Sequence, residues 1–116
     1  MLALVYDVHG NLPALEAVIA DAEAAGVEAW VLGGDYALFG GWPAETVARL
    51  RELEPATWIR GNGERWTADP AAAPEPVRPA TAAARAALDD DLVAELDALP
   101  PSAPLGDGTR AWHGSP

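Results

Sequence analysis

The chain has 116 residues, half of them apolar, and a formal net charge of −11 from 18 acidic and 7 basic residues. This length suits a single domain with one hydrophobic core, and the negative charge argues against a nucleic-acid polymer or an anionic membrane as a partner. Cysteine is absent, which excludes disulfides and thiolate metal sites, so any metal must be bound by oxygen and imidazole ligands.

The first predicted elements are a buried strand and an amphipathic helix. Residues 2–6 (LALVY) form a short continuous apolar run, which is typical of a strand in a parallel sheet. The run has neither the basic flank of a signal peptide nor the length of a membrane span, so we expect a cytoplasmic protein. A helix follows, with Asn11 as its N-cap and Gly26 closing it.

Two more strands alternate with a second helix. Residues 29–34 (AWVLGG) predict a buried strand that is followed at once by Asp35. Residues 43–55 predict a helix, and residues 56–62 (ATWIRGN) predict a third strand that runs into a Gly-Asn turn. Strands alternating with helices in this order indicate right-handed crossovers and a parallel sheet.

The second half of the chain is more irregular. Residues 67–80 are rich in proline and show no periodicity, so we expect an excursion without regular structure. Residues 81–101 predict two helical segments, with Asp89–Asp91 capping the second. Together, residues 67–101 form a Pro/Ala-rich and helical excursion within one domain. A Gly-Asp-Gly turn then precedes a fourth short strand over residues 109–112.

Metal-binding residue types follow each predicted strand. Asp7 and His9 follow the first strand, Asp35 the second, Asn62 the third and His113 the fourth. Ligands bind at the carboxyl ends of strands in open α/β sheets, so these side chains should converge. Side chains two residues apart in extended backbone point the same way, and Asp35 would lie roughly 5 Å away on the neighbouring strand. Taken singly, Asp7 is better explained as a turn residue and His9 as a surface histidine, and only the matching positions of Asp35, Asn62 and His113 favour a metal site.

These motifs resemble those of the calcineurin-like metallophosphoesterases, especially their small bacterial branch. That family reads D-x-H-G-N, G-D, G-N-x-[D/E], H-G and finally G-H-x-H. The matching residues here are Asp7, His9, Gly10, Asn11, Gly34, Asp35, Gly61, Asn62, Glu64, His113 and Gly114. The resemblance covers the whole chain but only the first part of a typical family domain. It implies an α/β fold with a parallel-rich sheet flanked by helices, part of the family's α/β sandwich and lacking its C-terminal strands.

The resemblance also implies a metal-dependent phosphoesterase acting on phosphate mono- or diesters. Asp7 and His9 would bind the first of two divalent ions, Asp35 would bridge both, and Asn62 and His113 would bind the second. A metal-bridging hydroxide would attack the phosphorus, with Asp35, Asn62 and His113 as the catalytic residues. Manganese is the first choice of metal, and iron, zinc, nickel and magnesium are alternatives.

Other residues near these motifs have less specific predicted roles. Asn11 and Arg60 are the candidate substrate-binding residues, although Asn11 is first of all a helix cap. We expect Glu64 to pair with Arg60 or Arg65 rather than to take part in chemistry. Trp112 lies inside a predicted strand, and we expect it in the core.

The chain departs from the family pattern at three points. Gly63 stands where many members carry a histidine that assists the leaving group, and Tyr6 stands where serine is common. No G-H-x-H segment occurs before Pro116, so we expect an incomplete domain with an open sheet edge through which two copies could associate. One alternative is a catalytically inactive remnant that binds metal weakly or serves as an interaction module, and another is a nucleotide-binding domain without hydrolysis.

Overall fold

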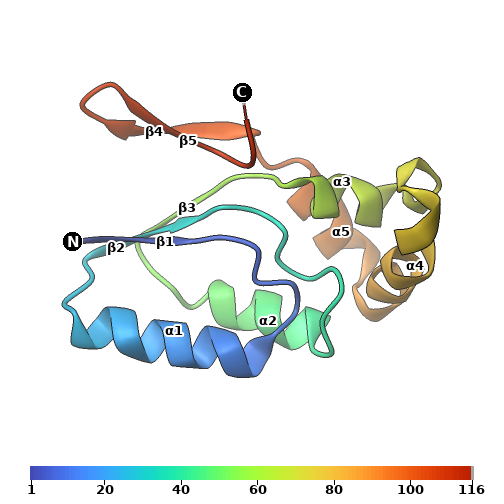
Figure 1. The fold of residues 1–116 in the computed structure, drawn as a ribbon, viewed down its shortest axis with the longest axis horizontal. Helices are drawn as coiled ribbons and strands as arrows, with labels where there is room; N and C mark the ends of the chain where they lie inside the picture. Colours follow the sequence, from blue (N-terminus) through green and yellow to red (C-terminus); the bar gives the residue numbers. More distant parts are fainter. Residues whose placement is uncertain (116) are drawn as a thin grey trace.

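Three short parallel strands form the central sheet of the computed structural model, which describes residues 1–115 (Figure 1). They are β1 (Leu2–Val5), β2 (Ala29–Leu32) and β3 (Ala56–Trp58), in the spatial order β1-β2-β3. The register places Leu4 opposite Val31, and Val31 opposite Thr57. The predicted parallel sheet is therefore confirmed, although each strand ends earlier than the apolar pattern indicated.

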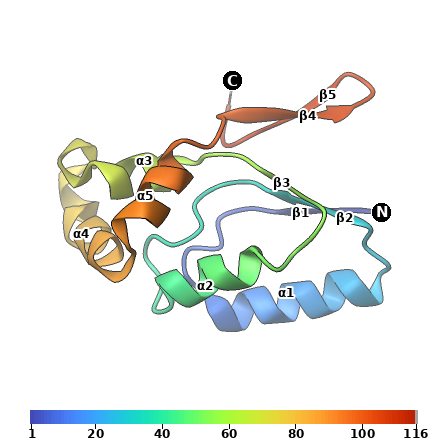
Figure 2. The same cartoon turned by 180° about the vertical axis from the view of Figure 1, so that it is seen from behind.

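Two helices cover one face of this sheet, as both views show (Figures 1 and 2). They are α1 (Leu12–Ala24) and α2 (Pro43–Leu50). Asn11 caps α1 as predicted, because its Oδ1 accepts the Ala14 N–H at 3.2 Å. The core between helices and sheet contains Leu15, Ile19, Trp30, Leu32, Val47 and Leu50. The second helix is shorter than predicted, since it ends at Leu50 and the chain reaches Pro55 through turns.

Three further helices pack together at one end of the sheet: α3 (Asn62–Ala68), α4 (Arg78–Ala87) and α5 (Asp90–Asp97) (Figure 1). Asn62 thus starts a helix, and the predicted Gly-Asn turn was wrong. The proline-rich stretch is more regular than expected, because it contains two short 3-10 turns, Pro70–Ala72 and Glu75–Val77. The two helical segments beyond it are confirmed. No helix among residues 1–115 is long and apolar enough to cross a membrane.

The predicted fourth strand belongs to a separate hairpin. β4 (Ser102–Gly106) pairs antiparallel with β5 (Thr109–Trp112), and neither strand joins the parallel sheet. The chain turns back on itself because Gly106, Asp107 and Gly108 all have a positive φ. The hairpin lies on the face opposite α1 and α2 (Figures 1 and 2), where its alanines pack against β2 and the residue after β3: Ala103 and Ala111 with Val31 and Ile59.

Candidate metal centre

The loops that follow β1 and β2 remain hydrogen-bonded beyond the strands. The Asp7 N–H donates to the Gly34 carbonyl at 3.2 Å, and the His9 N–H donates to the Asp35 carbonyl at 2.9 Å. Asp7, His9 and Asp35 all have left-handed backbone, with φ of 53°, 50° and 56°. The expected extended backbone at Asp7 and His9 was therefore wrong. Their side chains meet because two paired loops hold both residues in an uncommon conformation.

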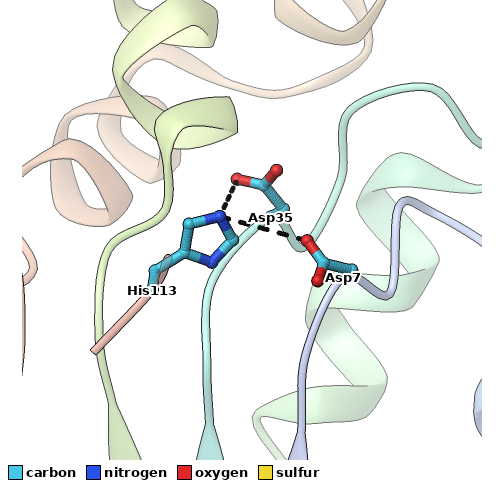
Figure 3. A group of neighbouring side chains, drawn as sticks. All are labelled: Asp7, Asp35 and His113. Atoms are coloured by element: carbon cyan, nitrogen blue, oxygen red, sulfur yellow. Dashed lines mark ion pairs between the residues drawn. The ribbon is translucent and has the colours of Figure 1, made fainter. Parts of the chain in front are cut away.

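Side chains from three different segments converge at this point (Figure 3). Ligand atoms of Asp7, Asp35 and His113 all lie within 4.8 Å of one another. Asp35 Oδ1 lies 3.6 Å from His113 Nε2, and Asp35 Oδ2 lies 3.8 Å from His9 Nε2. Asp7 Oδ1 lies 3.6 Å from His9 Nε2 and 4.0 Å from His113 Nε2. The two oxygens of Asp35 thus face different imidazoles, which is the arrangement that a bridging carboxylate requires.

Backbone carbonyls orient both imidazoles. His9 Nδ1 lies 2.9 Å from the Leu38 carbonyl oxygen, and His113 Nδ1 lies 2.7 Å from the Gly33 carbonyl oxygen. A carbonyl only accepts hydrogen bonds, so each Nδ1 must carry the proton. In the neutral ring, Nε2 then presents a lone pair toward the carboxylates. An imidazole held through its second nitrogen in this way is typical of metal-ligating histidines.

The centre is closed on the side of Asp35 and open on the side of Asp7. The Asp35 side chain is 6% exposed and the His113 side chain 14%, whereas the Asp7 side chain is 56% exposed. Asp35 Oδ1 also accepts the Gly63 N–H at 2.6 Å. A Cβ at position 61 would clash with the Asp35 carboxylate, and one at position 63 would lie 2.9 Å from Asp35 Oδ1. Glycine at both positions therefore lets the start of α3 approach this carboxylate closely.

Asn62 lies beside His113, as the predicted ligand pair requires. Asn62 Oδ1 is 3.0 Å from His113 Nε2, so two lone pairs face each other when the ring is neutral. Ligand atoms that share one ion at about 2.1 Å lie roughly 3–3.5 Å apart. A shared cation would satisfy both lone pairs. Two carboxylates, two imidazoles and one amide therefore fit the divalent ions that prefer oxygen and nitrogen ligands.

Glu64 has a role that the sequence reasoning missed. Its predicted partners were Arg60 or Arg65, but the buried carboxylate instead accepts three backbone N–H groups, those of Asp35, Tyr36 and Gly61, at 2.7–3.0 Å. Burial raises the pKa of the Glu64 carboxyl, and the three N–H groups oppose that rise. Glu64 joins the loops after β2 and β3 and so positions Asp35. A signal was available, because an acid three residues after a helix N-cap is the second half of a capping box.

The two candidate substrate-binding residues lie in different surroundings. Asn11 serves as the cap of α1. Arg60 Nη1 lies 2.7 Å from the Asp97 carbonyl oxygen and 3.3 Å from Asp97 Oδ1. Arg60 also lines a cavity of about 420 Å³ together with Asn62 and His113. Arg60 therefore lies near Asn62 and His113, the predicted ligands of the second ion. Asn11 lies at the end of the loop that carries Asp7 and His9, the predicted ligands of the first ion.

Comparisons with known proteins identify a family and related folds. A family model described as calcineurin-like phosphoesterase matches residues 3–109. The fold is similar to the crystal structure of a metallophosphoesterase from Sphaerobacter thermophilus, with a TM-score of 0.75 and 31% sequence identity over 91% of this chain and 44% of that one. It is also similar to a hypothetical protein from Pyrococcus horikoshii OT3, with a TM-score of 0.72 and 22% identity over 89% and 50% of the two chains, a likeness of fold alone. No curated protein shows significant similarity.

The matched region contains the motifs whose side chains converge at the end of the sheet, apart from the final His-Gly at residues 113 and 114, which lies just beyond it. The chain spans about half the length of the solved structures that it matches. Members of the family depend on metal ions and act on phosphate esters. The match over most of the chain, and the convergence of Asp7, Asp35 and His113, lead to one conclusion: this chain belongs to the calcineurin-like phosphoesterase family.

Proposed function

We propose that this chain forms the metal-binding part of a phosphoesterase that hydrolyses phosphate mono- or diesters with two divalent ions. The observation that carries the proposal is the position of Asp35, whose two oxygens face the imidazoles of His9 and His113. Asp7 and His9 would hold one ion, Asn62 and His113 the other, and Asp35 both. Bound ions of this kind lower the pKa of water and neutralise charge on phosphoryl oxygens.

The side chains of the chain itself supply binding and orientation. Both histidines direct Nδ1 to a backbone carbonyl, so Nε2 of the neutral ring is available as a ligand. Asn11 uses Oδ1 as a helix cap, which leaves its NH₂ group to donate to a phosphate oxygen. Arg60 lies where a second oxygen or the ester arm would pass. Position 63 offers no imidazole, so the leaving group must take its proton from another source.

The first test is calorimetric titration of manganese into the 116-residue chain and into the Asp35→Asn variant. Asparagine keeps the shape of the side chain and tolerates the left-handed backbone, so the change removes mainly the charge. We expect the wild type to bind about two ions per chain and the variant to bind at least about tenfold more weakly. Asp107→Asn is the matched control, because Asp107 is exposed, has a positive φ and lies in the distant hairpin turn.

The second test is hydrolysis of p-nitrophenyl phosphate and bis(p-nitrophenyl) phosphate by the same three proteins with added manganese. Activity that is lost in Asp35→Asn and kept in Asp107→Asn would support the phosphoesterase. Specific metal binding without turnover of any ester would favour the alternative, a remnant that binds metal. Absence of saturable metal binding in the wild type would contradict the proposal outright.

A further inference from the structure

A cavity of about 420 Å³ adjoins the metal centre on the side of His113. Its walls come from the start of α3 and from the chain that follows β5, which lie next to each other because Asn62 contacts His113. The lining also includes two arginines and a tryptophan: Arg60, Arg65 and Trp112. A substrate with its phosphoryl group at the metal centre would extend its ester arm into this cavity. The residues of the cavity therefore select among ester arms.

The charge of the cavity differs from that of the rest of the molecule. The chain carries 18 acidic residues against seven arginines and no lysine, yet two of the seven arginines line this one cavity. The five arginines outside the cavity all have partners: Arg49 with Glu16 and Glu52, Arg51 with Glu95, Arg78 with two carbonyls, Arg85 with Asp90, and Arg110 with Ser102. Of the two arginines in the cavity, Arg60 is paired with Asp97. The side chain of Arg65 forms no hydrogen bond or ion pair with any residue in the range 1–115.

Within residues 1–115 nothing pairs with the guanidinium of Arg65, so it can receive an anion. A guanidinium binds carboxylate or phosphate through two parallel hydrogen bonds, and the Nε and Nη2 donors of Arg60 are not committed to Asp97. At physiological salt, charges more than about 8 Å away are largely screened. The closer carboxylates, those of Asp7 and Asp35 beside His113, would be neutralised by the ions of the proposed metal centre, so the two arginines would set the charge of the cavity. The cavity can therefore bind an anion even though the whole molecule is acidic.

Trp112 adds an apolar surface to the same cavity. We expected this residue in the core, but it is half-buried at the end of β5 and lines the cavity with His113. An indole face packs well against a flat ring. The two arginines line the same cavity, so a ring bound on Trp112 can carry an anionic group that reaches a guanidinium.

We infer that the cavity binds the ester arm of the substrate and selects arms that combine a planar ring with a second anionic group, a carboxylate or a phosphate. This inference rests on the proposed phosphoesterase function, because the cavity shares Asn62 and His113 with the metal centre. Arg65 is the specificity-determining residue. It stabilises the second anion and does not touch the scissile phosphate.

The test compares two substrates, 4-carboxyphenyl phosphate and its neutral isostere 4-carbamoylphenyl phosphate, in the wild type and in Arg65→Gln. The ratio of their kcat/KM values is compared between proteins, so the different reactivity of the two leaving groups cancels. We expect Arg65→Gln to lower the relative preference for the carboxylate about fivefold or more. Arg49→Gln removes one positive charge from α2, which lies on the face of the sheet opposite the hairpin, and should leave the ratio unchanged. An identical ratio in the wild type and in Arg65→Gln would overturn the inference.

A binding measurement separates failure of this inference from failure of the proposed function. Calorimetry would compare 4-hydroxybenzoate with 4-hydroxybenzamide in the same proteins. If no ester is turned over, a preference for 4-hydroxybenzoate that disappears in Arg65→Gln would still support the anion-selective cavity. Equal affinity of both compounds for the wild type would contradict it, whatever the outcome of the hydrolysis assay. Manganese affinity should be the same in the wild type and in Arg65→Gln, because Arg65 is no ligand.

Discussion

At the scale of single residues, the site combines ligand chemistry with unusual backbone geometry. Asp7, His9 and Asp35 have left-handed φ values, and aspartate and histidine are among the non-glycine residues that adopt this region most often. The residue types that bind metal at these positions therefore also tolerate the local backbone. Asp35 is the most constrained of the three, because its carboxylate is nearly buried and accepts the Gly63 N–H.

The glycine at position 61 should be essential for the position of Asp35. In Gly61→Ala, the new Cβ would clash with the Asp35 carboxylate and would lie 2.7 Å from the Asp35 backbone nitrogen. We expect a loss of about 1–3 kcal/mol in the free energy of unfolding and weaker manganese binding. Urea denaturation and calorimetry would measure the two effects. Gly41→Ala is the control, because a Cβ there meets nothing within 4 Å. Equal behaviour of the two variants would show that Asp35 moves without penalty.

At the scale of elements, each strand end contributes one part of the centre, and the hairpin contributes His113. This histidine directly follows β5, and its Nδ1 contacts the carbonyl of Gly33, the residue directly after β2. The hairpin is held on the sheet by a small apolar contact in which Ala103 and Ala111 are buried. Such a contact is small compared with the main core, so the second ion position depends on an element with modest stabilisation.

A charge placed under the hairpin should release His113 and leave the α/β layer folded. In Ala111→Asp, the carboxylate would be buried without a partner against Val31 and Ile59. We expect manganese affinity to fall about tenfold or more, while far-UV circular dichroism still shows the helices. Thr109→Asp adds the same charge at an exposed position of the same strand and should bind metal like the wild type. Unchanged affinity in Ala111→Asp would mean that His113 stays in place independently of the hairpin.

At the scale of the whole molecule, one part of the parallel sheet is left uncovered. β1 is an edge strand, and its residues alternate, with Val5 packed in the helix-side core and Leu2 and Leu4 exposed. The hairpin packs against Val31 and Ile59 and does not bury these two leucines. An edge strand with exposed apolar side chains favours association with another chain.

We therefore expect the 116-residue chain to form dimers at high concentration through β1. Leu4→Lys should raise the dissociation constant at least about tenfold, because lysine on an edge strand opposes pairing. Sedimentation velocity over a concentration series would measure this change. Ala83→Lys is the control, since Ala83 is exposed on α4, which packs against α3 and not against β1. A wild type that remains monomeric over the whole series would contradict this prediction.

The sequence by itself determined the order of the three parallel strands and their two crossover helices, and the positions of the candidate ligands along the chain. Apolar runs located the three parallel strands, polar caps located the starts of α1 and α5, and the motifs placed the candidate ligands at strand ends. These features are local, because periodicity and capping depend on residues that are neighbours in the chain. Family resemblance then supplied the chemistry that the spacing alone left open.

Only the tertiary structure decided how the ligands meet. The left-handed backbone at Asp7 and His9 depends on hydrogen bonds to a loop more than twenty residues away, and Glu64 finds its partners in that same loop. The hairpin pairs β5 with β4 instead of extending the parallel sheet, and this pairing brings His113 to Asp35 from the opposite face. Such contacts join distant segments, so no local pattern encodes them, and the packing of the whole chain selects them.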